Sequence, residues 1–323
     1  MVLQTIYVFR TTFHIDPSTG IYTSHIPTPT SIPADVPLTS YGVQQSRQLG
    51  VYLETIKPPI ERVYCSAFSR CLQTLKGAVE EGGWRWGLAG GKEEETRVER
   101  GIGEWFGPAP WPHPSPAPLS VLLSQYPAST TTKPSLNISP DYISHIIPAQ
   151  NGETIAELHQ RVAFALESII QDLDAEEGEP RTVLLCTHAA TMIAIGRVLT
   201  GEEERRFGAW CCGVSRFDRR RDNNNNNNNS MRSVGGVGTE DVKRRELLER
   251  PVRGWRPDEV GRWKGGKGIL GGWDCVVDGE CGFLSGGRER GWHFTDDEAF
   301  DTGPGARGSE DVDVERKRSE AKL

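Results

Sequence analysis

Short apolar runs alternate with longer segments of helical spacing over the first two thirds of the chain. Strands are predicted where β-favouring runs occur, at 4–9, 61–66, 182–186 and 212–217. Helices are predicted where apolar residues recur every three or four positions, at 43–56, 67–81, 154–173 and 190–199. This alternation predicts an α/β fold, a three-layer sandwich in which helices flank a mostly parallel sheet.

The pattern changes after residue 221. Residues 222–268 hold a run of seven Asn and many Gly, Arg and Lys, which predicts a low-complexity linker. Residues 269–302 regain apolar and aromatic side chains, and Asp278-Gly279 between two β-like runs predicts a hairpin in a short β module. The charged end, 303–323, is predicted to be disordered, which leaves 1–221 as the main domain.

Two further segments in the main domain lack a clear period. Residues 82–98 are rich in Gly and Glu and are expected to form an exposed insertion. Residues 108–149 contain many Pro and are expected to form a long loop or lid, a kind of segment that is often functional.

Composition narrows the class of protein. The net charge of -7 argues against an electrostatic nucleic-acid binder. No apolar stretch approaches the ~18 residues of a membrane span, and the N-terminus lacks a signal-peptide layout. The seven Cys show no zinc spacing, so a reduced compartment, nucleus or cytoplasm, and no metal are expected.

Candidate chemistry falls at the carboxyl ends of the predicted strands. Arg10 ends the first strand, the turn 66–70 with Arg70 follows the second, and His188 follows a later strand. In parallel sheets these ends meet at one edge, where ligands bind. Two guanidinium forks and an imidazole suit a phosphoryl group. The competing interpretation is a buried His that ties its turn together, with Arg residues in surface ion pairs.

Six blocks carry a family resemblance. They are IYVFR at 6–10, the segment 38–53, VYCSAFSRCLQTL at 63–75, GIGEWFG at 101–107, NGETIAELHQRV at 151–162 and TVLLCTHAATMIAIGRVLTG at 182–201. Their order and spacing resemble the histidine phosphatase superfamily, with its phosphoglycerate-mutase-like fold. The resemblance implies a phosphohistidine mechanism without metal or cofactor. In it, Arg10, Arg70 and His188 would hold a phosphate-bearing ligand and Glu104 would protonate the leaving oxygen, with Glu99 as a second candidate acid.

The chain departs from that family at the nucleophile. Where the family has Arg-His-Gly, this chain has Arg10-Thr11-Thr12. A Thr hydroxyl without a dedicated base is a poor nucleophile, so a phosphohistidine cannot form at this position. His14 is a candidate substitute if its loop folds back. The departure is either a loss of function or an exon-boundary error in the gene prediction.

The tail carries a second resemblance. Residues 273–294 hold Trp273, Asp274, Cys275, a Phe-Leu-Ser-Gly-Gly run and Trp292. This set resembles the tau55-related β module of the small subunit of TFIIIC, a transcription factor of RNA polymerase III. The resemblance implies a protein partner bound through 269–294, such as another TFIIIC subunit. The alternative is a Gly-rich tail that happens to hold aromatics.

Three hypotheses stay open from the sequence. The chain is a catalytically impaired phosphatase-like subunit of that factor, an active phosphomonoesterase whose first motif is misread, or a structural pseudoenzyme that binds no phosphate. A phosphosugar, a phosphoprotein and a nucleotide all remain possible substrates.

Overall fold

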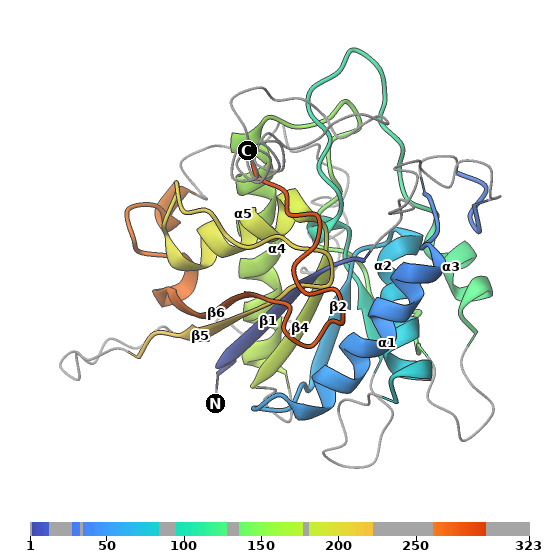
Figure 1. Ribbon diagram of the computed structural model, residues 1–323. Helices are drawn as coiled ribbons and strands as arrows, with labels where there is room; N and C mark the ends of the chain where they lie inside the picture. Colours follow the sequence, from blue (N-terminus) through green and yellow to red (C-terminus); the bar gives the residue numbers. More distant parts are fainter. Residues whose placement is uncertain are drawn as a thin grey trace, which may run out of the picture.

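A six-stranded sheet forms the centre of the molecule in the computed structural model, which describes residues 2–12, 28–32, 35–83, 95–127, 136–176, 181–221 and 261–294 (Figure 1). The strands are β1 (Thr5–Arg10), β2 (Arg62–Cys65), β3 (Thr96–Val98), β4 (Thr182–Thr187), β5 (Val214–Arg219) and β6 (Trp273–Glu280). Their order in the sheet is β3-β2-β4-β1-β5-β6. The first four in the chain are mutually parallel, and β5 runs antiparallel to β1 and β6. The predicted mostly parallel α/β sheet is therefore confirmed.

Helices cover both faces of this sheet (Figure 1). The helices are α1 (Ser40–Thr55), α2 (Ser69–Lys76), α3 (Leu119–Gln125), α4 (Ile155–Ala175) and α5 (Ala189–Thr200). Alternate side chains of each central strand enter opposite cores, because successive residues of a strand point to opposite faces. Tyr7 and Phe9 pack with α1 and α2, whereas Ile6 and Val8 pack with α4 and α5. The three predicted layers follow from this alternation.

The ends of the long helices follow local rules. Thr39 caps α1 by accepting a hydrogen bond from the Gly42 amide, and Thr154 forms a capping box with Glu157 at the start of α4. Gly201 ends α5 with φ of +79°. A Cβ at Gly201 would lie 2.5 Å from the Lys267 amide nitrogen, so a glycine is needed there for the close approach of residues 266–268.

The C-terminal segment completes the same sheet. The predicted hairpin at Asp278-Gly279 is wrong, because both residues lie inside the single strand β6. Asp278 accepts a hydrogen bond from the Gly208 amide at 2.7 Å, and the Gly279 amide donates to Ser215 at 2.9 Å, so the two residues bind the main domain rather than turning back. Of the expected linker, 222–260 lies outside the described residues, whereas 261–268 packs against the core through the buried Trp263.

Other expectations differ in detail from the structure. The predicted helix 67–81 is α2 followed by a π-helical turn at Gly77–Glu81, and the loop 108–149 contains the short helix α3. His14 and 295–323, which includes the predicted disordered tail, lie outside the described residues. Over the described ranges, none of the helices has the length and apolar character needed to cross a membrane.

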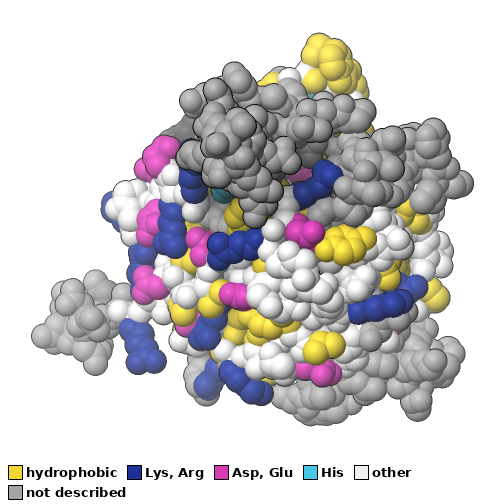
Figure 2. Space-filling model, viewed as in Figure 1, with side chains coloured by type: hydrophobic (Ala, Val, Ile, Leu, Met, Phe, Trp, Pro, Cys, Tyr) yellow, Lys and Arg dark blue, Asp and Glu magenta, His cyan; other side chains and the backbone are white. Residues whose placement is uncertain are grey.

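Basic and acidic side chains interleave on the face shown in Figure 2. Two arginines, one on β5 and one just after it, pair with neighbouring acids. Arg216 and Asp218 lie 2.7 Å apart, and Arg220 and Asp274 lie 2.8 Å apart. These two pairs place acidic groups between the basic ones of this region.

Candidate functional site

The turns after β1, β2 and β4 meet at the carboxyl edge of the sheet. Register brings Arg10 opposite Thr187, and Cys65 opposite Cys186. Backbone hydrogen bonds continue this pairing beyond the strands, from the Thr11 amide to the Thr187 carbonyl at 2.8 Å and from the Ser66 amide to the Cys186 carbonyl at 3.0 Å. The edge therefore places Thr11, Ser66 and His188 in one neighbourhood.

Three of the predicted site residues form a direct cluster. The Glu104 Oε2 atom accepts a hydrogen bond from Arg70 Nη2 at 2.9 Å and lies 3.1 Å from His188 Nδ1. Glu104 Oε1 accepts from the Trp105 amide at 3.0 Å. Arg70 and His188 are buried, while about a quarter of the Glu104 side chain is exposed. One carboxylate oxygen thus lies between two groups that can each carry positive charge.

Electrostatics favour the charged forms of Glu104 and His188. Burial alone would raise the pKa of Glu104, but His188 and Arg70 lower it well below the usual carboxyl range. Burial alone would lower the pKa of His188, but the negative charges of the Cys71 sulfur and the Glu104 carboxylate raise it above the ordinary imidazole value. The cluster therefore places the Arg70 and His188 cations on either side of one carboxylate.

The other nitrogen of His188 has partners that the sequence patterns did not single out. His188 Nε2 lies 2.7 Å from Ser66 Oγ and 3.5 Å from Cys71 Sγ. Burial opposes ionisation of Cys71, yet a hydrogen bond from Cys186 and the charge of His188 set its pKa well below the ordinary thiol value. Ser66 and Cys71 could have been found in the sequence from their positions beside Arg70. Ser66 begins the turn that carries Arg70, and Cys71 follows Arg70 on α2.

Thr11 and Thr12, which stand where the resemblance predicts His-Gly, are part of the packed interior. Thr11 is 3 % exposed, and its hydroxyl donates to the Arg70 carbonyl at 3.0 Å and lies 3.0 Å from Thr74 Oγ1. Thr12 has no exposed surface and donates to Gln45 Oε1. Both hydroxyls tie the end of β1 to α1 and α2, and none of these described partners is a base that could activate Thr11.

The Arg10 side chain contacts backbone carbonyls outside the Arg70–Glu104–His188 cluster. Its Nη1 atom donates to the Ala209 carbonyl at 2.8 Å and to the Arg290 carbonyl. Arg10 therefore holds the C-terminal segment against the turn before β5, while Arg70, Glu104 and His188 contact one another without it. Its predicted role as a phosphate ligand stays a prediction.

Glu99 also lies outside the cluster contacts. It is fully buried, and it accepts hydrogen bonds from the Tyr142 hydroxyl at 2.6 Å, the His145 amide at 2.9 Å and the Gly101 amide at 2.6 Å. Burial raises its pKa to about 7, against the effect of these donors. Glu99 thus holds residues 142–145 to the end of β3.

A small cavity of about 40 Å³ opens beside the cluster. Ser66, Phe68, Glu104, Phe106 and His113 are among the residues that line it. The described residues contain no group of three or more His, Cys, Asp or Glu side chains arranged to hold a metal ion. Glu104 and Ser66 connect this cavity to the cluster, and Arg100 and Gln150 are also among its polar lining residues.

Comparison with known proteins supports the resemblance seen in the sequence. The family model "Histidine phosphatase superfamily (branch 1)" matches residues 29–112, a range that includes Arg70 and Glu104. Residues 29–112 are therefore similar to this superfamily, and the α/β architecture described above is the fold that the resemblance predicts.

Curated relatives are similar to this chain over part of their length. The transcription factor tau 55 kDa subunit of Saccharomyces cerevisiae is 33 % identical over 208 residues, which are 64 % of this chain and 43 % of the yeast protein. The ecdysteroid-phosphate phosphatase of Drosophila melanogaster is 30 % identical over 52 % of this chain and 20 % of its own length. The chain thus spans less than half the length of these relatives.

A solved structure is similar in arrangement. The ecdysone phosphate phosphatase of Bombyx mori in complex with tungstate matches with a TM-score of 0.47 and 16 % identity, covering 74 % of this chain and 99 % of that one.

Proposed function

We propose that this chain is a catalytically impaired histidine-phosphatase-like subunit of the RNA polymerase III factor TFIIIC. The observation that carries the impairment is Thr11 in the place of the nucleophile, with its hydroxyl engaged by Arg70 and Thr74. A covalent phosphoenzyme of this family needs an imidazole at that position, and a hydroxyl without a base does not replace it.

The state of Glu104 also supports impaired chemistry. A general acid must hold a proton near the working pH, and its pKa is best placed close to that pH. Arg70 and His188 keep the pKa of Glu104 far below the usual carboxyl range, so the side chain is ionised. An ionised Glu104 cannot donate a proton to a leaving oxygen. It could do so only if a bound anion replaced Glu104 as the partner of Arg70 and His188, because the pKa of Glu104 would then rise.

Anion binding is expected to persist without turnover. The two cations Arg70 and His188 support a pocket that holds a phosphate-bearing ligand, with His188 contributing its charge. An active phosphomonoesterase is the second candidate function, and the juxtaposition of these three side chains favours it, because they are the groups that the family resemblance assigns to phosphate binding and proton transfer.

A phosphatase assay separates the two candidates. We expect the full chain and its His188→Ala variant to hydrolyse p-nitrophenyl phosphate at the same background rate, because no nucleophile is present.

Phosphate binding is measured separately by thermal unfolding. Inorganic phosphate should raise the melting temperature of the wild type and not of Arg70→Ala, because the variant lacks a cation of the proposed anion pocket. Turnover by the wild type that His188→Ala abolishes would establish the active enzyme instead. Absence of phosphate protection in the wild type would favour the structural pseudoenzyme.

The assembly part of the proposal rests on two sequence resemblances. One is the similarity to the yeast transcription factor subunit, and the other is the predicted β module at 269–302. A nuclear location and protein partners follow from this proposal. The structure adds that 273–280 is an edge strand, and an edge strand has unpaired backbone groups available for a partner.

Affinity purification tests the assembly. We expect the tagged full chain, expressed in its own cells, to co-purify with other subunits of the RNA polymerase III factor. The His188→Ala variant is the matched control and should retain the same partners, because His188 follows β4, and β1 and β5 lie between β4 and the β6 edge. Recovery of the folded chain without any of those subunits would refute the proposed role in the assembly.

A further inference from the structure

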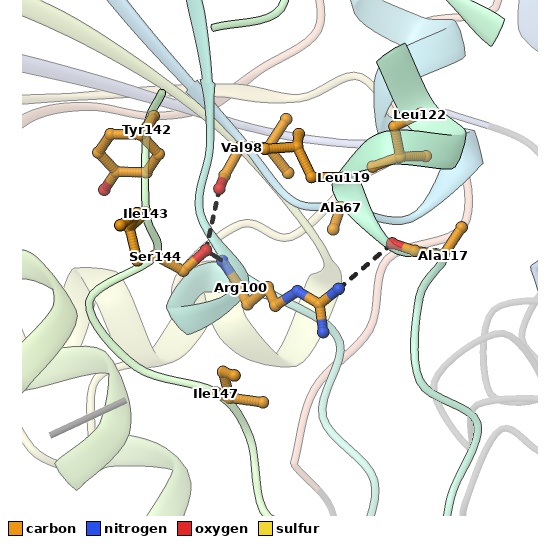
Figure 3. Close-up of a pocket in the computed structure, with 10 residues that line it drawn as sticks. All are labelled: Ala67, Val98, Arg100, Ala117, Leu119, Leu122, Tyr142, Ile143, Ser144 and Ile147. Carbon is orange, nitrogen blue, oxygen red and sulfur yellow. Dashed lines mark hydrogen bonds between the residues drawn. The ribbon is translucent and has the colours of Figure 1, made fainter. Parts of the chain in front are cut away.

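A second, larger cavity lies between the end of β3, α3 and residues 142–147 (Figure 3). Its volume is about 240 Å³, which equals the liquid volume of about eight water molecules. The walls are mainly apolar and include Val98, Ala117, Leu119, Leu122, Tyr142 and Ile143. Such a space fits the apolar body of a small organic molecule, such as a fused ring pair.

One charged side chain enters this cavity. The Arg100 guanidinium extends between the apolar walls, and its Nη2 atom donates to the Ala117 carbonyl at 3.3 Å (Figure 3). Among the described residues it forms no ion pair with a carboxylate. Its sequence neighbour Glu99 is occupied by the Tyr142 hydroxyl and two amides. A guanidinium has five N–H donors, so most of those of Arg100 are available to a ligand.

Other polar groups in the cavity wall are already satisfied. The Ser144 hydroxyl donates to the Val98 carbonyl at 3.0 Å and accepts from the Arg100 amide at 3.0 Å. Burial in these apolar surroundings lowers the pKa of Arg100, and the charge of the neighbouring Glu99 opposes this shift from outside ion-pair distance. An unpaired, partly desolvated cation is costly, and a bound anion would offset that cost.

We propose that this cavity binds a small amphipathic organic anion, whose carboxylate-type head group pairs with Arg100 and whose apolar body packs among Val98, Leu119, Leu122 and Tyr142. The single cation selects one anionic group, and the apolar walls exclude a strongly hydrated ligand such as free phosphate. The fork geometry of arginine matches a carboxylate or phosphate head with two hydrogen bonds.

This cavity adjoins the smaller one beside the His188 cluster, and Arg100 lines both. The smaller cavity beside the cluster shares Ala67, Arg100 and Ile147 with the larger one. The head group of the proposed ligand binds Arg100 and not Arg70 or His188. The inference therefore does not depend on whether the His188 cluster binds phosphate or catalyses a reaction.

Calorimetry with a matched pair of probes tests the proposal on the full chain. Naphthoate carries the anionic head, and naphthalenemethanol has the same ring system without charge. We expect naphthoate to bind one molecule per chain, and naphthalenemethanol to bind at least about tenfold more weakly, since a charge-assisted pair with Arg100 is lost. Arg100→Leu should weaken the binding of naphthoate by a similar factor, and Arg100→Lys should weaken this binding less.

Control variants locate the binding. Arg262→Leu removes an exposed arginine from another part of the surface and should leave naphthoate affinity unchanged. His188→Ala should also leave it unchanged, which separates this site from the proposed anion pocket. Leu119→Trp fills the cavity and should abolish binding of both probes, with circular dichroism confirming that each variant is folded. Failure of naphthoate to bind the wild type, equal binding of the two probes, or unchanged affinity in Arg100→Leu would overturn the proposal.

Discussion

Replacing Glu153 by Ala is expected to lower the free energy of unfolding by about 3–5 kcal/mol, as is usual when one partner of a buried ion pair is removed. Arg161 has no exposed surface and Glu153 is 2 % exposed. The Arg161 Nε atom lies 2.9 Å from both carboxylate oxygens of Glu153. Without that carboxylate the guanidinium would remain buried in the interior without a counterion.

The same pair supports the segment that carries Glu104. Arg161 Nη1 donates to the carbonyls of Gly101 at 2.7 Å and Gly103 at 3.3 Å, and the Trp105 indole donates to the Glu153 carbonyl at 2.8 Å. Loss of the Glu153 carboxylate should therefore also loosen the segment 101–105. In the folded variant, this would weaken phosphate protection of the melting temperature.

Urea denaturation measures the free energy of unfolding of Glu153→Ala, and two further variants serve as controls. Glu202→Ala removes a surface ion pair with Arg205 and should change the free energy of unfolding by no more than about 1 kcal/mol. The double variant Glu153→Ala with Arg161→Met should be more stable than Glu153→Ala alone, because it removes the unpaired charge. A change in Glu153→Ala as small as that in Glu202→Ala would show that the buried pair does not support the fold.

Trp273→Ala is expected to cost about 3–5 kcal/mol, the range for removing a buried large aromatic side chain. Trp273 begins β6 and has no exposed surface. It pairs in register with Arg219 of β5, whose guanidinium lies 5.5 Å from the centre of its ring. The loss would leave a cavity in the core shared with α4 and α5.

The same strand provides a matched control. Val276 is 53 % exposed on β6, so Val276→Ala should change the free energy of unfolding by no more than about 0.5 kcal/mol. If 261–294 is part of the cooperative unit, urea unfolding of Trp273→Ala should be a single transition at lower urea concentration. Equal stability of the two variants would mean that this segment folds apart from the main domain.

Much of the fold could be predicted from local patterns. The apolar runs at 182–186 and 4–9 correspond to the central strands β4 and β1, and the spacing in 154–173 corresponds to α4. These predictions succeeded because a strand buried on both faces and a helix with one apolar face each leave a period in the sequence. The hairpin at 278–279 failed because the Asp-Gly signal is local, whereas Gly208 and Ser215 hold these residues in a strand.

The site was predicted in part for a similar reason. Parallel strand topology brings the turns after β2 and β4 together, so Arg70 and His188 could be expected near each other. The direction of a side chain depends on partners distant in the chain, and Arg10 is directed to the carbonyls of Ala209 and Arg290. Ser66 and Cys71 were missed because a lone hydroxyl or thiol has no pattern until an imidazole lies beside it.

The sequence by itself determined the α/β class, the family resemblance, the strand ends that carry Arg70 and His188, and the absence of an imidazole at Thr11. Only the tertiary structure decided that Glu104 lies between those two cations, that β6 joins the main sheet, and that Arg100 enters an apolar cavity without a carboxylate partner among the described residues. The physical reason is the range of the interactions. Periodicity and caps depend on neighbours within a few residues, whereas ion pairing, desolvation and sheet order depend on groups that folding brings together.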